Sequence, residues 1–265
     1  MLTFAQALQP KSVEEAYQAV VKYKAAPILA GGCWTRLVRR KWPMVIDLSG
    51  LGLRYIEEAE TEYRIGAMAT QRDVELYEPF RTLCGGALVK AVHPILGVQF
   101  RNMATMGGSV AARFGFSDII PALLAMKADV ELFDAGRMSV EPYLVTNVRD
   151  LITAICIPKR EAAVAIEALR KSASDFPYLA GSVRIDDEGY HIYIGARPNK
   201  AEKAVKAGEI LKEKGLDALE EAARTASEEL KFQSNSHASA EYRRRMTVGM
   251  VRRMIREAAE GRTWK

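Results

Sequence analysis

The sequence predicts an α+β protein with two domains, and three observations lead to this fold class. The chain has 265 residues, of which 49% are hydrophobic and 27% charged, enough apolar sequence for two modest cores. Its N-terminal part alternates strand-like and helix-like segments, and its C-terminal part combines a hairpin with helical sequence. We therefore expect one domain over residues 1–160, with subdomains 1–52 and 53–160, and a second over residues 161–265.

The N-terminal elements form a small β/α unit. Ser12 and Glu15 have the spacing of a capping box and precede apolar positions at helical intervals, which predicts a helix over Ser12–Tyr23. The apolar run Pro27–Gly32 predicts a buried strand that leads into a loop. Met44–Gly50 predicts the next strand.

Short elements follow from Arg54 onward, where the hydrophobic pattern changes to alternation. The stretch Tyr63–Ala69 predicts a strand, and helices are expected over Gln71–Phe80 and Gly85–Leu96. A hairpin is predicted over Ala128–Tyr143 with its turn at Asp134–Gly136, and a closing strand is expected over Leu151–Pro158.

The C-terminal part begins with a charged segment, Lys159–Arg170, which we interpret as the domain boundary. Leu179–Asp186 and Tyr190–Pro198 flank a turn-forming stretch and predict a hairpin, and most of the remainder is helical in pattern. The last helix carries several arginines, which we assign to a solvated face opposite its apolar residues. These arginines are Arg243, Arg244, Arg245, Arg252, Arg253 and Arg256.

Several functional classes lack support in the sequence. No run of about 18 apolar residues is available for a membrane span, and the N-terminus lacks a signal-peptide pattern, so a cytoplasmic location is expected. The net charge of +5 is mild, and only Tyr242 accompanies the basic helix, which does not favour nucleic-acid binding. Neither the G-x-G-x-x-G nor the P-loop motif is present.

Cysteine and histidine usage gives no metal site. The three cysteines are far apart and odd in number, which favours reduced thiols, and an iron–sulfur cluster normally needs four. The three histidines are equally scattered, so no zinc site is predicted. Any iron–sulfur cluster would therefore belong to another chain. The residues are Cys33, Cys84, Cys156, His93, His191 and His237.

Two glycine pairs are the strongest functional signal. Gly107 and Gly108 lie in the segment Arg101–Asp118, where they allow close approach of the backbone to a ligand, with hydroxyl and carboxylate groups nearby. Gly31 and Gly32 end the first predicted strand, and the amide groups of such a loop can hold a phosphate. Each pair alone is equally compatible with a simple tight turn. Together they indicate a nucleotide cradle.

The order of these motifs resembles the FAD-binding subunit of the molybdenum hydroxylases, a group that includes xanthine dehydrogenase and the medium subunit of aerobic carbon monoxide dehydrogenase. The resemblance rests on AGG, VIDLSGL, YRIGAMAT, RNMATMGG and the SD that precedes PALLAMKADVEL, and it continues through residues 172–185 and 239–246. It implies a two-subdomain FAD-binding fold of the PCMH type, followed by a small sheet-plus-helices domain like the C-terminal domain of the CO dehydrogenase flavoprotein.

The resemblance also implies a set of cofactor-binding residues, with no catalytic side chain and no metal ligand. Thr105 is expected to reach a phosphate of FAD and Asp118 a polar part of the cofactor, although Asp118 could instead cap the following helix. Ile95 corresponds to an isoalloxazine contact or to a core residue. The full set is Leu29, Ala30, Gly31, Gly32, Cys33, Trp34, Thr35, Ile95, Ala104, Thr105, Gly107, Gly108, Ser109, Ser117 and Asp118.

This chain departs from the family pattern at three places. Cys33 and Trp34 follow the first glycine pair, where the family usually has Thr or Gln and then Asp, Ser or Glu. Ser109 stands where the family most often has Asn. The segment Arg113–Phe116 replaces a small-Ser-Pro segment.

The implied function is electron transfer by an oxidoreductase subunit of xanthine dehydrogenase or CO dehydrogenase type. The flavin would receive electrons from a partner iron–sulfur subunit, with the molybdenum cofactor on a third chain, and pass them to NAD or another acceptor. Two alternatives stay open at this point. One is a flavin-free scaffold or interaction protein of the same fold, and the other is a self-sufficient FAD oxidoreductase.

Overall fold

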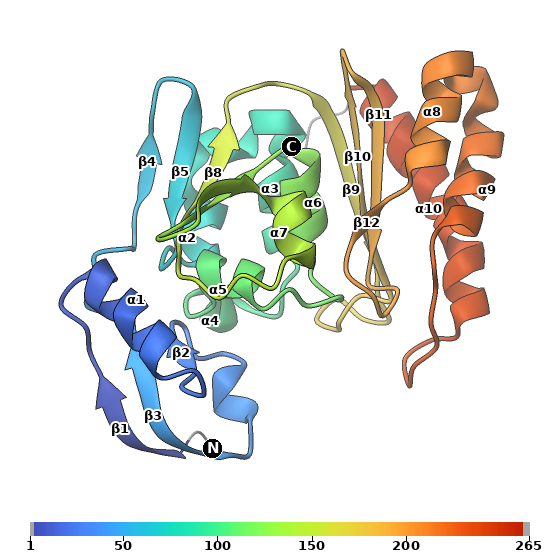
Figure 1. Ribbon diagram of the computed structural model, residues 1–265. Helices are drawn as coiled ribbons and strands as arrows, with labels where there is room; N and C mark the ends of the chain where they lie inside the picture. The colour runs from blue at the N-terminus through green and yellow to red at the C-terminus, as the bar shows by residue number, and fades with distance from the viewer. Residues whose placement is uncertain (1–2, 262–265) are drawn as a thin grey trace. The chain divides into compact units, whose positions relative to one another are not determined.

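The computed structural model describes residues 3–261, and these residues form two compact units (Figure 1). Among the described residues, the first unit comprises 3–76, 97–112 and 128–158, and the second comprises 77–96, 113–127 and 159–261. Each unit is thus assembled from segments that are far apart in the sequence. The predicted α+β class is confirmed, and the predicted domain boundary near residue 160 stays a prediction.

A small parallel sheet begins the first unit. Its strand order is β1-β3-β2, and the helix α1 packs against it through Ala16, Ala19 and Val20. Ser12 caps this helix as predicted, since its side chain accepts a hydrogen bond from the Glu15 amide at 3.1 Å. The bounds are β1 Thr3–Leu8, α1 Val13–Lys22, β2 Ile28–Leu29 and β3 Lys41–Asp47, with a short 3₁₀ turn at Thr35–Leu37.

A five-stranded antiparallel sheet completes the first unit, in the order β4-β5-β8-β6-β7. The predicted hairpin is present as β6 and β7, and Gly136 adopts a φ of 72° at its turn, which glycine tolerates without strain. The strands are β4 Ile56–Glu58, β5 Glu62–Gly66, β6 Asp129–Leu132, β7 Gly136–Ser139 and β8 Ile152–Pro158. The helices are α2 Gln71–Leu76, α4 Val98–Arg101, α5 Met106–Ala111 and α7 Val140–Val145.

The second unit is built on a four-stranded antiparallel sheet with helices on both faces (Figure 1). Val183 of β10 packs into an apolar core with α8, α9 and α10, whereas its neighbours Ser182 and Arg184 hydrogen-bond to carbonyls of α6. Alternate side chains of the strand therefore serve opposite faces. The strands are β9 Ala163–Leu169, β10 Leu179–Asp186, β11 Gly189–Gly195 and β12 Glu202–Lys203. The helices are α3 Ala87–Val92, α6 Ile119–Ala125, α8 Val205–Lys214, α9 Leu219–Glu229 and α10 Ala240–Ala259, and 3₁₀ turns span Glu78–Arg81, Leu83–Gly86 and Gly215–Ala218.

Two interpretations of the C-terminal sequence need correction. The segment Lys159–Arg170 is not merely a connection, because Ala163–Leu169 forms the edge strand β9 of the second sheet. Arg243 does not lie on a solvated face: its side chain is fully buried, and its guanidinium donates hydrogen bonds to the carbonyls of Tyr178, Gln233 and Ala238. These hydrogen bonds compensate for the loss of water around the charge.

Candidate cofactor site

The two glycine segments predicted from the sequence lie against each other in the first unit. A Cβ added to Gly31 would lie 1.7 Å from the carbonyl oxygen of Met103, a distance at which no side chain can fit. Met103 immediately precedes Ala104 of the second segment. The contact between the loops therefore requires glycine at position 31, and it places residues 29–35 beside residues 104–109.

The first loop is half-exposed and carries a protected thiol. Leu29 to Gly32 are all partly accessible, and Gly32 has a φ of 67°, a conformation suited to glycine. Cys33 is buried, and its Sγ lies 3.8 Å from the carbonyl oxygen of Gly31, to which it donates. Burial raises the pKa of the Cys33 thiol, against the opposing effect of Arg36. Cys33 is therefore a neutral thiol, and it is one of three free cysteines.

The second loop uses its two glycines differently. A Cβ on Gly107 would come within 2.7 to 2.9 Å of three atoms of Ala67, and the Gly107 amide donates to the Ala67 carbonyl at 2.9 Å. Gly107 is therefore a packing residue. Gly108 is exposed, and a Cβ there would meet only the Thr105 hydroxyl oxygen, at 2.8 Å. The backbone at Gly108 is therefore exposed at the surface of the unit, with no side chain covering it.

Thr105 and Ser109 close a small hydrogen-bonded turn around Gly108. The Thr105 hydroxyl oxygen accepts from the Gly108 amide at 3.2 Å, which caps α5. The Ser109 hydroxyl donates to the Thr105 carbonyl at 2.7 Å. Thr105 is buried beneath this turn, whereas Ser109 is half-exposed. The two hydroxyls thus fix the backbone conformation of residues 105–109.

A buried ion pair that the sequence analysis did not single out supports the second loop. Arg101 of α4 binds Glu75 of α2 through two hydrogen bonds of 2.9 and 3.0 Å, and both side chains are 94% buried. Arg72 adds a third contact to Glu75 at 2.7 Å. A buried pair of this kind is strongly destabilised when one partner is removed. Arg101 is the first residue of the RNMATMGG motif, so the sequence signal that could have pointed to this ion pair is a charged residue at the start of that motif.

Three predicted residues, Ile95, Ser117 and Asp118, belong to the second unit. Asp118 does not cap α6, because it is the Ser117 hydroxyl that accepts from the Ile120 amide at 3.2 Å. The Asp118 carboxylate instead binds the Arg170 guanidinium at 2.5 Å, and both side chains are about nine-tenths buried. The capping alternative for Asp118 is therefore wrong. Ile95 is half-buried and lies outside the unit's buried core.

Burial dominates the electrostatics of Asp118. It raises the pKa of this carboxyl to about 6, although the neighbouring Arg170 acts in the opposite direction. Arg170 is also held by the Asp175 carbonyl, which accepts from it at 3.0 Å. The segment Arg113–Phe116, which departs from the family pattern, ends two residues before Asp118. The centroid of the Phe116 ring lies 4.9 Å from that of Phe114, on which it stacks, and 4.9 Å from that of Phe176.

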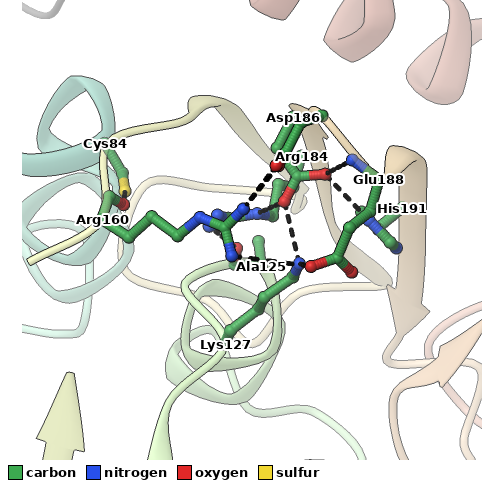
Figure 2. A network of polar contacts seen from close by, with 9 residues as sticks. Cys84, Ala125, Lys127, Arg160, Arg184, Asp186, Glu188 and His191 are labelled. Atoms are coloured by element: carbon green, nitrogen blue, oxygen red, sulfur yellow. Dashed lines mark hydrogen bonds and ion pairs between the residues drawn. The ribbon is translucent and has the colours of Figure 1, made fainter. Parts of the chain in front are cut away.

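Among residues 3–261, one cluster of side chains has the composition of a metal site. It is part of an ion-pair network in the second unit (Figure 2). Asp186, Glu188 and His191 place their ligand atoms within 4.8 Å of one another. The Lys127 ammonium, however, lies 2.9 Å from Asp186 and 2.7 Å from Glu188, and Arg184 donates to Asp186 at 2.6 Å. Cations of the protein already neutralise these carboxylates, so we assign no metal to them.

Comparison with known proteins identifies the family. Residues 3–160 match the FAD binding domain in molybdopterin dehydrogenase, and residues 164–258 match the CO dehydrogenase flavoprotein C-terminal domain. The chain belongs to this family of FAD-containing oxidoreductase domains, and the predicted family and cofactor are confirmed. Within residues 3–261, no helix combines the length and apolar character needed to cross a membrane.

The similarity to individual proteins extends over nearly the whole chain. The nicotine 6-hydroxylase medium subunit of Paenarthrobacter nicotinovorans is 28% identical over 272 residues, covering 94% of this chain and 95% of that protein. The carbon monoxide dehydrogenase medium chain of Afipia carboxidovorans is 27% identical over 282 residues, with the same coverage of both. A structure of reconstituted CO dehydrogenase from Oligotropha carboxidovorans superposes with a TM-score of 0.86 at 26% identity, covering 97% of this chain and 99% of that chain.

Proposed function

We propose that this protein is the FAD-carrying electron-transfer subunit of a molybdenum hydroxylase, and that its two contacting glycine loops hold the cofactor. Two relatives of matching length are medium subunits, so the same place in a multi-subunit enzyme is proposed here. Bound FAD would supply the redox chemistry, because it can accept electrons singly or in pairs. Electrons would come from an iron–sulfur subunit, itself served by a molybdenum-cofactor subunit, and leave to NAD or another acceptor.

The contact between Gly31 and Met103 is the observation that carries this proposal. It brings two segments that are more than seventy positions apart along the chain into one surface. On that surface Gly32 and Gly108 leave backbone uncovered by a Cβ, as close approach to a pyrophosphate requires. The residues present therefore fit a dinucleotide. The sequence-predicted contacts of Leu29–Thr35 and Ala104–Ser109 with FAD are proposed on this basis.

The residues predicted in the second unit remain proposals of the same kind. Ser117 fixes the start of α6 through its hydroxyl, and this positions Asp118. Asp118 already has an ionic partner in Arg170, so a cofactor group would share or replace that pairing. Ile95 is half-buried, as a residue that packs on a flavin ring would be.

Reconstitution tests the proposal. The purified chain, stripped of cofactor and titrated with FAD, should bind it and show flavin absorbance without an iron–sulfur signal. It should not oxidise nicotine, carbon monoxide or a purine alone, although NADH-driven dye reduction is expected if NAD is its acceptor. Adding the iron–sulfur and molybdenum-binding subunits from the same organism should restore substrate-driven flavin reduction.

Two results would contradict the proposal. A wild-type chain that folds but binds no FAD would remove the cofactor site from these loops. A chain that oxidises an organic substrate unaided would replace the subunit function with that of a self-sufficient flavoenzyme.

A further inference from the structure

Gln71 has a half-satisfied side chain at the edge of the second glycine loop. It is the first residue of α2, and only 4% of its surface is exposed. Its backbone amide donates to the Ala104 carbonyl at 2.8 Å, and its side-chain Nε2 donates to the Ser109 hydroxyl oxygen at 3.1 Å. Gln71 therefore holds both ends of the segment Ala104–Ser109.

The hydrogen bonds of Ser109 fix which way the Gln71 carboxamide faces. A hydroxyl group has one proton, and that of Ser109 is donated to the Thr105 carbonyl at 2.7 Å. Ser109 can therefore only accept from Gln71, so the NH₂ group must face Ser109. The carbonyl oxygen Oε1 faces the other way.

That oxygen is buried and lacks a hydrogen-bond donor in the part of the chain that the structure describes. Buried carbonyl oxygens in native proteins are almost always paired, because an unpaired one loses its hydration without compensation. An unpaired acceptor that remains beside a ligand-binding loop indicates that the donor belongs to the ligand.

We propose that Gln71 is a further FAD-binding residue, whose Oε1 accepts a hydrogen bond from a hydroxyl or N–H group of the cofactor. Oε1 is covered in the free protein, so the side chain turns outward about its flexible bonds when the cofactor binds, while the Gln71 backbone stays bonded to Ala104. This inference rests on the proposed function.

Replacing the carboxamide with an apolar side chain of similar length tests the inference. Gln71→Met should raise the dissociation constant for FAD about tenfold, the effect of one lost hydrogen bond in a buried site. The unfolding midpoint of the cofactor-free variant should stay close to that of the wild type, because loss of the hydrogen bond to Ser109 is offset by removal of the unpaired buried oxygen. A purely structural Gln71 would give the opposite pattern, with lower stability and unchanged affinity.

A second substitution tests whether the two positions share one role. Ser109→Asn in the Gln71→Met background should restore the affinity for FAD to within about threefold of wild type, because the carboxamide returns from the neighbouring position. Gln99→Leu, which removes an exposed carboxamide from the same unit, is the matched control and should leave affinity unchanged. If Gln71→Met fails to fold, Gln71→Leu replaces it.

The outcomes separate this inference from the function on which it rests. Wild-type protein that binds no FAD contradicts the proposed function. Wild-type protein that binds FAD while folded Gln71→Met or Gln71→Leu binds it equally well overturns the role of Gln71 alone. Failure of Ser109→Asn to restore binding overturns the exchange of the carboxamide between the two positions.

Discussion

In both glycine pairs one glycine permits close packing and the other leaves backbone uncovered, although the surroundings of the two pairs differ. In each pair the first glycine is pressed against backbone, Gly31 on Met103 and Gly107 on Ala67. The second glycine of each pair has no such neighbour: Gly32 adopts a positive φ and Gly108 is exposed. A glycine pair can therefore contain one residue that permits packing and one that leaves backbone open to a ligand.

The surroundings of the two loops teach a further distinction. The second loop is braced by the buried Arg101–Glu75 pair and by Gln71, all from the same unit. The first loop leads into a short 3₁₀ turn, Thr35–Leu37, and residues 36–41 are exposed. We expect the second loop to be the more rigid of the two, since local stability follows from buried contacts.

The largest expected effect is that of Gly31→Ala. Its methyl group would overlap the Met103 carbonyl oxygen, so the loops must separate, at a cost of about 3 kcal/mol in unfolding free energy. Urea unfolding of the cofactor-free protein measures this loss. Gly50→Ala is the control, because no atom lies within 4 Å of its added Cβ. Equal stability of the two variants would contradict the contact between the loops.

Gly108→Val should abolish retention of FAD while leaving the protein folded. The valine side chain would cover the open face of the second loop, where an added Cβ meets only the Thr105 hydroxyl oxygen. The flavin-to-protein absorbance ratio after gel filtration measures retention, and circular dichroism checks the fold. Wild-type flavin content in a folded variant would exclude Gly108 from the cofactor site.

Asp118→Asn should remove a pH dependence of stability. The raised pKa of about 6 means that the folded protein binds this proton more tightly than the unfolded chain, whose carboxyl titrates near 3.8. The wild type should therefore lose up to about 3 kcal/mol relative to the variant as pH rises from about 4 to 6. Unfolding free energies measured across this range give the difference. Asp217→Asn, at a surface carboxylate, is the control. Parallel curves for wild type and Asp118→Asn would contradict the burial of this carboxyl.

Thr105→Ala is expected to have the smallest effect. It removes one hydroxyl, so the affinity for FAD should fall by about 1 kcal/mol, or roughly fivefold. Loss of the cap on α5 should lower the unfolding free energy by a similar amount. Thr105→Ser keeps the oxygen and should behave like the wild type in both isothermal titration and unfolding. An unchanged dissociation constant for Thr105→Ala would remove the hydroxyl from the site.

Elements with a local signal were predictable, and those that depend on tertiary contacts were not. The first helix and the hairpins followed from the Ser12 cap and from turn residues such as Gly136 and Gly189. The strand β1 was not predicted, because its residues Thr3–Leu8 are almost entirely exposed and show no alternation. The flanking charges of Lys159–Arg170 concealed the apolar centre of β9.

The same distinction holds for the site. The glycine pairs were visible as residue types, but the contact of Gly31 with Met103 depends on how the chain folds back on itself. The environment of Gln71 could not be predicted for the same reason, since its partner Ser109 lies 38 positions away. The role of Arg243 was mispredicted because three of its hydrogen-bond acceptors are backbone carbonyls, which leave no pattern in the sequence.

The most direct test of the division between packing and cofactor-facing glycines is a comparison of four alanine variants, at Gly31, Gly32, Gly107 and Gly108. Each is measured twice, by urea unfolding without cofactor and by fluorescence titration with FAD. We predict that Gly31→Ala and Gly107→Ala mainly lower the unfolding free energy and that Gly108→Ala mainly weakens FAD binding. Gly32→Ala should do both, because its φ of 67° is strained for alanine. If all four variants lose stability and affinity in the same proportion, the two glycines of each pair do not have separate roles and the account is contradicted.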